Sequence, residues 1–84
     1  MISDYQKELL TITMEECAEI IQACSKIIRF GDTTEKLNNL EKEIGDLQCM
    51  IDLLHKNDYI SFTKVDEYAI EKQEKLKVYS NLFK

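Results

Sequence analysis

The sequence predicts an all-α fold, a small antiparallel helical bundle. The chain has no proline and only two glycines, and its apolar residues recur at the three- and four-residue steps of a helix throughout. At 84 residues the chain predicts a single domain over residues 1–84. A chain of this length buries only about 60% of its unfolded surface. We therefore expect the bundle to be completed by oligomerisation.

The first helix is expected to begin at Ser3 or Asp4 and to end at Phe30. Ser3 and Gln6 have the spacing of a capping box, in which each residue satisfies the other's backbone N–H at a helix start. Gly31 follows the last apolar step, where glycine commonly ends a helix.

The second helix is expected over about residues 35–55, with Thr33 or Thr34 as its N-cap. The connection before it is short, and short connections favour antiparallel neighbouring helices. Gly45 lies inside this helix, where glycine costs about 1 kcal/mol relative to alanine. We attribute this glycine to close packing of the two helices.

A third helix is expected over about residues 63–82, with Thr63 and Asp66 as its capping pair. Six of its residues recur at helical spacing and are expected to face inward. These are Val65, Tyr68, Ala69, Lys72, Leu76 and Tyr79.

Acidic residues stand where the first helix should present core residues. Its apolar stripe stops after Ile12 and resumes at Ala23, and Glu16 and Glu19 occupy the missing steps. Side chains three apart on a helix are neighbours, with Cβ atoms roughly 5–6 Å apart. The two carboxylates can therefore hold one ion together.

A second acidic pair, Glu43 and Asp46, lies within or beside the apolar stripe of the second helix. Across the short turn the two pairs are predicted to face each other, which needs a compensating cation. An all-oxygen ligand set suits Mg²⁺ or Mn²⁺, and Mg²⁺ usually also binds substrate phosphates. The pattern therefore indicates a hard-metal site and nucleotide chemistry. The apolar stripe itself consists of Leu40, Leu47, Met50 and Leu54.

The charge balance limits the partners. With 11 basic and 16 acidic residues, the net charge of −5 argues against binding of a nucleic acid polymer. No apolar run approaches the roughly 20 residues of a membrane span, and the N-terminus lacks the apolar stretch of a signal peptide. Cys17, Cys24 and Cys49 form no ligand motif and are interpreted as small core residues in a reducing compartment. We expect a soluble, cytoplasmic protein without a membrane partner.

The two acidic segments together resemble the MazG-like all-α nucleoside triphosphate pyrophosphohydrolases. That family carries E-E-x-x-E on one helix and E-x-x-D on the next, and this chain has Glu15, Glu16 and Glu19 followed by Glu43 and Asp46. The resemblance implies an Mg²⁺-dependent enzyme, with Mn²⁺ as a substitute. Such an enzyme cleaves nucleoside triphosphates between the α and β phosphates, giving monophosphate and pyrophosphate in nucleotide-pool house-cleaning or shaping.

Carried over by position, the resemblance implies metal ligands at Glu16, Glu19, Glu43 and Asp46, and a supporting catalytic role for Glu15. It also implies a homodimer or homotetramer.

Three further residues are candidates for binding substrate. Lys72 and Lys75 match basic positions that family members place against the phosphates, although a solvated, salt-bridged surface explains the same pattern. Asp52 could line a base pocket, with a surface salt bridge as the alternative. His55 near the end of the second helix is interpreted as a helix cap.

Two other classes of protein are weighed against the enzyme. A non-enzymatic helical metal-binding or interaction module would keep its acids opposite the apolar stripes, whereas here they lie on or beside them. A di-iron carboxylate bundle requires Glu-x-x-His pairs on inward faces, and this chain has none. The enzyme is the favoured interpretation.

Overall fold

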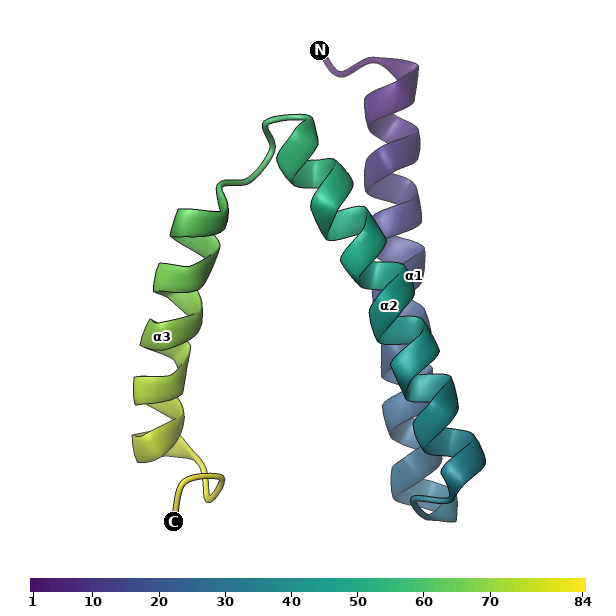
Figure 1. The fold of residues 1–84 in the computed structure, drawn as a ribbon, viewed down its shortest axis with the longest axis vertical. Helices are drawn as coiled ribbons and strands as arrows, with labels where there is room; N and C mark the ends of the chain where they lie inside the picture. Colours follow the sequence, from purple (N-terminus) through teal and green to yellow (C-terminus); the bar gives the residue numbers. More distant parts are fainter. The chain divides into compact units, whose positions relative to one another are not determined.

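A computed structural model describes residues 1–84 and contains three helices and no strand. Helix α1 spans Asp4–Phe30, α2 spans Thr34–Lys56 and α3 spans Phe62–Tyr79. The all-α prediction is confirmed. The chain forms two compact units, Met1–Leu54 and His55–Lys84. The helices of the two units are seen in Figure 1.

Local hydrogen bonds fix both ends of α1. The Gln6 N–H donates to Ser3 Oγ at 3.1 Å and the Ser3 N–H donates to Gln6 Oε1 at 2.7 Å, so the predicted capping box is present. At the other end the Gly31 N–H donates to the carbonyl of Ile27 at 2.8 Å. Gly31 has φ 96° and ψ 165°, a conformation that is essentially restricted to glycine.

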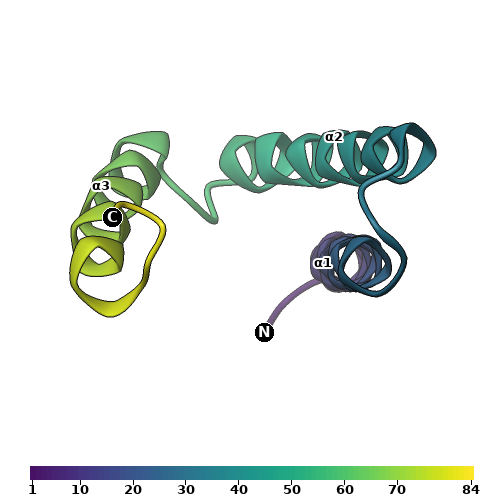
Figure 2. The same cartoon turned by 90° about the horizontal axis from the view of Figure 1, so that it is seen from below.

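Helices α1 and α2 form an antiparallel hairpin (Figure 1). The three-residue connection 31–33 joins them (Figure 2). Thr33 caps α2, since the Lys36 N–H approaches Thr33 Oγ1 at 3.4 Å. Helix α2 ends at Lys56, where Asp58 adopts a positive φ of 61° and its N–H donates to the carbonyl of His55 at 3.0 Å.

The core of the hairpin is thin. Only Leu9, Ala23 and Met50 are buried apolar residues, at 4%, 2% and 7% exposure, and Glu43 is buried at 7%. The core lies along the seam, the line of contact between α1 and α2, with a charged residue between the apolar ones. Such a core is small for an independently stable domain.

The second unit contains α3. Ser61, rather than the predicted Thr63, lies at the N-cap and accepts from the Lys64 N–H at 3.5 Å. The helix ends at Tyr79 and carries no buried residue, so the side chains predicted to face inward are not buried within this unit. His55 stacks on Phe62, with ring centroids 4.0 Å apart.

Two sequence-based interpretations are wrong for this structure. All three cysteines are exposed rather than core residues, because each lies away from the seam on its helix. Gly45 is not explained by close packing, since a Cβ atom there would meet no atom within 4 Å. None of the three helices combines the length and apolar character that crossing a membrane requires.

Candidate metal centre

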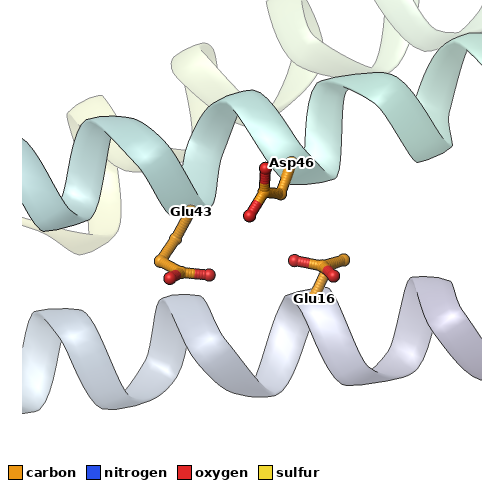
Figure 3. Close-up of side chains that lie close together, drawn as sticks. All are labelled: Glu16, Glu43 and Asp46. Carbon is orange, nitrogen blue, oxygen red and sulfur yellow. The ribbon is translucent and has the colours of Figure 1, made fainter.

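Three carboxylates meet across the middle of the seam. The side chain of Glu16 on α1 points toward α2, and those of Glu43 and Asp46 on α2 point toward α1 (Figure 3). One oxygen from each residue lies within 4.8 Å of the others. Glu43 and Asp46 are three residues apart and so share one side of α2, while the antiparallel turn brings Glu16 opposite them. The predicted meeting of acids from both helices is therefore present for these three residues.

The cluster is partly removed from water. Glu43 is 7% exposed and Glu16 and Asp46 are half-buried. Glu16 Oε2 is buried and has no hydrogen-bond partner. A buried polar atom without a partner is destabilising, and more so when it is charged. A cation or a hydrogen-bond donor next to Glu16 Oε2 would therefore be stabilising.

Burial raises the pKa of Glu16 above its ordinary value of 4.5, and the negative charges of Asp46, Glu43 and Glu19 raise it further. The positive charge of Lys42 partly opposes this effect. The carboxylates thus repel one another in the metal-free chain, as expected for a site built for a cation.

Lys42 is the one basic group in contact with the cluster. Its Nζ lies 2.8 Å from Asp46 Oδ2 and 3.7 Å from Glu43 Oε1. The hydrogen bond to Asp46 is the main reason that the pKa of Lys42 is raised. Sequence reasoning missed this residue, although its place four residues before Asp46 has the spacing of a helical ion pair. Lys42 stays largely exposed, so it neutralises the cluster only in part.

The other two acids of the motif lie beside the cluster. Glu19 is exposed and outside the three-residue group, yet close enough for its charge to raise the pKa of Glu16. Glu15 is exposed and rotated about 100° from Glu16 on the helix.

The predicted substrate-binding residues lie elsewhere. Asp52 is exposed and accepts a hydrogen bond from Gln48 Nε2 at 3.0 Å. Lys72 and Lys75 belong to α3 in the second unit, where both are exposed and Lys75 pairs with Glu71 at 3.7 Å. Their roles stay predictions.

Two hollows lie along the hairpin on either side of the cluster. One, of about 130 Å³, is mostly apolar and is lined by Tyr5, Glu8, Leu9, Ile12, Met50 and Leu53. The other, of about 330 Å³, is polar and is lined by Lys26, Glu35, Lys36 and Asn39.

Both hollows lie on the side of the hairpin that carries Glu19 and Asp46. Residues seven apart share a helix face. Ile12 and Lys26 are each seven residues from Glu19, and Asn39 and Leu53 are each seven from Asp46. We call this side the acid face. Along α1 from its N-terminus, this face carries the apolar hollow, then the carboxylates, and then the polar hollow with Lys26 and Lys36.

The donor set fits a hard divalent cation. The group offers only carboxylate oxygens, the ligands that Mg²⁺ and Mn²⁺ prefer, and one of these oxygens is buried without a partner. The group contains no histidine or cysteine, the ligands that a softer metal favours.

Comparison with known proteins gives the family. The model of the MazG nucleotide pyrophosphohydrolase domain matches residues 5–77, which include both acidic segments and parts of both units. No curated protein and no solved structure matches the chain. Because the match covers most of its length, the chain belongs to the MazG nucleotide pyrophosphohydrolase family.

Proposed function

We propose that this protein is an Mg²⁺-dependent nucleoside triphosphate pyrophosphohydrolase that acts in nucleotide-pool house-cleaning or shaping. Membership of the MazG family supports pyrophosphohydrolase chemistry on a nucleotide. The observation that carries the proposal is the cluster of three carboxylates, within 4.8 Å of one another, with one buried oxygen lacking a partner.

In the proposed reaction, water attacks the α phosphorus and the bond from that phosphorus to the bridging oxygen of the β phosphate breaks. The products are a nucleoside monophosphate and pyrophosphate. When bound, the metal ion supplies positive charge to the triphosphate and lowers the pKa of a bound water. Glu16, Glu43 and Asp46 would hold it, and one carboxylate of the cluster would accept the proton of the attacking water.

The remaining acids of the motif have lesser proposed roles. Glu19 is close enough to the cluster to join the ligand set after a change of side-chain rotamer. Glu15 is proposed to orient water or an additional ion from the same helix. Mn²⁺ is the expected substitute for Mg²⁺, since both are hard cations.

The acid face supports one orientation of the substrate. The apolar hollow begins about one helical turn, or about 6 Å, from Glu16, the distance from Ile12 along the helix axis. A nucleoside base fits an apolar hollow next to Tyr5, since aromatic rings stack on bases. The terminal phosphates would then extend toward Lys26 and Lys36 on the other side of the acids. Lys72, Lys75 and Asp52 stay candidates for additional contacts with substrate.

The test is pyrophosphate release from a panel of ribo- and deoxyribonucleoside triphosphates, with Mg²⁺ and with chelator. Glu43→Gln is the blank, because it removes a charge from the cluster while keeping the shape of the side chain. We expect metal-dependent release by the wild type and at least a hundredfold less by the variant, the scale of losing a main electrostatic contributor. Glu41→Gln, on an exposed acid of α2 outside the cluster and outside both hollows, is the matched control for loss of charge on α2.

Release of monophosphate and pyrophosphate in equal amounts would confirm cleavage between the α and β phosphates. Absence of release from every triphosphate, with both Mg²⁺ and Mn²⁺, would reject the enzyme and favour a helical metal-binding or interaction module.

A further inference from the structure

One lysine of α2 contacts the carboxylate cluster in a way that the other paired lysines do not share. Lys42 Nζ lies 2.8 Å from Asp46 Oδ2 and 3.7 Å from Glu43 Oε1, so a single ammonium contacts two acids. The ion pairs on α3 each join one lysine to one acid, and both side chains of each pair are exposed. The Glu43 side chain, in contrast, is only 9% exposed. Lys42 therefore pairs with a buried acid of the candidate metal centre as well as with an exposed neighbour on its own helix.

Lys42 compensates the charge of the cluster only in part. The three carboxylates have oxygens within 4.8 Å of one another, and their negative charges repel. The ammonium of Lys42 offsets this charge at the two acids of α2. Its ion pairs do not include Glu16, whose Oε2 atom is buried without a hydrogen-bond partner. The acid contributed by α1 is therefore left without a cation.

A divalent cation at this site would need the carboxylates that Lys42 already contacts. Glu43 and Asp46 are two of the three residues whose oxygens could hold a metal ion. Lys42 Nζ lies within 4 Å of both. Charges of the same sign repel almost unscreened at separations well below the Debye length, which is about 10 Å in 0.1 M salt. The ammonium and a metal ion therefore compete for the same two acids.

The metal ion has the advantage in this competition. The Lys42 side chain is 67% exposed, and its charge is carried on a flexible four-carbon stem. It can turn into solvent at little cost, because exposed ion pairs contribute little to stability. A divalent cation carries twice the charge of an ammonium and can also contact the Glu16 oxygen that Lys42 leaves without a partner.

We propose that Lys42 is a counter-ion built into the metal-free cluster. Its ammonium pairs with Glu43 and Asp46 until a divalent cation binds, and that cation displaces it. The affinity of the free site for a metal ion is therefore lower than its three carboxylates alone would give. This inference rests on the proposed function, because it requires the same metal site.

The opposite role for Lys42 would be to hold Asp46 in the rotamer that binds the metal ion. A side chain that positions another needs to be fixed itself, whereas Lys42 is mostly exposed. The two roles predict changes of opposite sign. Removal of a competitor strengthens metal binding, and removal of a positioning residue weakens it.

Titration with Mn²⁺, in which the free ion is counted by its electron paramagnetic resonance signal, measures metal affinity without substrate. Lys42→Met keeps the length of the side chain and removes its charge. We expect this variant to bind Mn²⁺ about three- to tenfold more tightly than the wild type, a modest change because the competitor is an exposed ion pair. Displacement of the bound Mn²⁺ by Mg²⁺ then gives the affinity for Mg²⁺, which should change in the same direction.

Two control variants isolate the charge at this position. Lys7→Met removes the same charge from an exposed position of α1, nine residues or about 14 Å along the helix from Glu16, and should leave the affinity within about twofold of the wild type. Lys42→Arg keeps the charge in place and should bind Mn²⁺ no more tightly than the wild type. Circular dichroism confirms that each variant is helical.

The outcomes separate this inference from the proposed function. Unchanged or weaker Mn²⁺ binding by Lys42→Met would overturn the inference, and so would binding by Lys42→Arg as tight as that of Lys42→Met. Absence of saturable Mn²⁺ binding in every protein would reject the metal site and with it both proposals. The expected change in affinity without pyrophosphate release from any triphosphate would reject the enzyme and leave the role of Lys42 standing.

Discussion

Met50 and Glu43 lie seven residues apart on the same side of α2, and each is 7% exposed. One is an apolar side chain in a normal core position, and the other is a carboxylate with the same burial. Met50 contributes to stability through the area that it removes from water. Glu43 contributes charge that repels its neighbours until a cation is present. The same burial therefore contributes to the fold at Met50 and to the proposed metal site at Glu43.

The largest effect on stability is expected at the apolar member of the pair. Met50→Ala removes a buried side chain and should lower the free energy of unfolding by about 2–5 kcal/mol. Urea unfolding followed by helical circular dichroism, at one fixed protein concentration, measures it. Met14→Ala, at a position of α1 that is 71% exposed, is the control and should change the free energy of unfolding by less than about 0.5 kcal/mol. A loss below about 1 kcal/mol for Met50→Ala would mean that the seam is not the core.

A smaller effect of opposite sign is expected at Gly45, between the two acids of α2. Nothing lies within 4 Å of a Cβ atom at this position, so Gly45→Ala should gain helix propensity without a clash. The expected increase in the free energy of unfolding is about 1 kcal/mol. Gly31→Ala is the contrasting variant, since its φ of 96° strains any other residue and should make the chain less stable. A loss of stability in Gly45→Ala would show that a neighbouring molecule packs against α2 there.

The smallest effect is expected from Glu16→Gln in the metal-free protein, and it depends on pH. The pKa of Glu16 is raised above 4.5 by burial, by Asp46, Glu43 and Glu19, and is partly lowered by Lys42. The folded chain therefore holds the proton more tightly than the unfolded chain. Stability due to this proton is present below pH 4.5 and is lost as pH rises through the folded pKa.

Thermal unfolding of wild type and Glu16→Gln with chelator, from pH 4 to pH 8, would measure this difference. The two melting temperatures should agree at the acidic end, and the variant should be the more stable one at neutral pH. Saturating Mg²⁺ should reverse the order, because only the wild type retains all three carboxylates of the cluster. A variant that is less stable at every pH would identify a structural role for Glu16.

Most features that depend on neighbouring residues in the sequence agree with the prediction, but the N-cap of α3, expected at Thr63, lies at Ser61. The capping box of Ser3 and Gln6, the end of α1 at Phe30 and the cap of α2 at Thr33 follow from local hydrogen bonds. The meeting of Glu16 with Glu43 and Asp46 was also predictable, because a short turn and helical spacing determine which sides of two helices face each other.

The other errors concern packing, which spacing along one helix does not determine. Cys17 and Cys24 have core-like spacing, yet each follows a seam residue of α1 by one position and so lies about 100° from the seam, exposed. A helix that is apolar over more than half of its circumference offers two candidate faces, and the sequence alone does not say which one its neighbour in the same chain covers. Lys42 was missed because an ion pair within one helix is common on exposed surfaces and does not by itself indicate a site.

The three-residue connection between α1 and α2 has a consequence for how this chain can vary. Glu16 and Glu43 meet only while the number of residues between them keeps both on the seam. One residue added or removed within either helix on that stretch turns one acid about 100° away from the other. Within the helical parts of the interval, 17–30 and 34–42, changes of length are therefore incompatible with the acid cluster, and insertions compatible with it belong outside these parts.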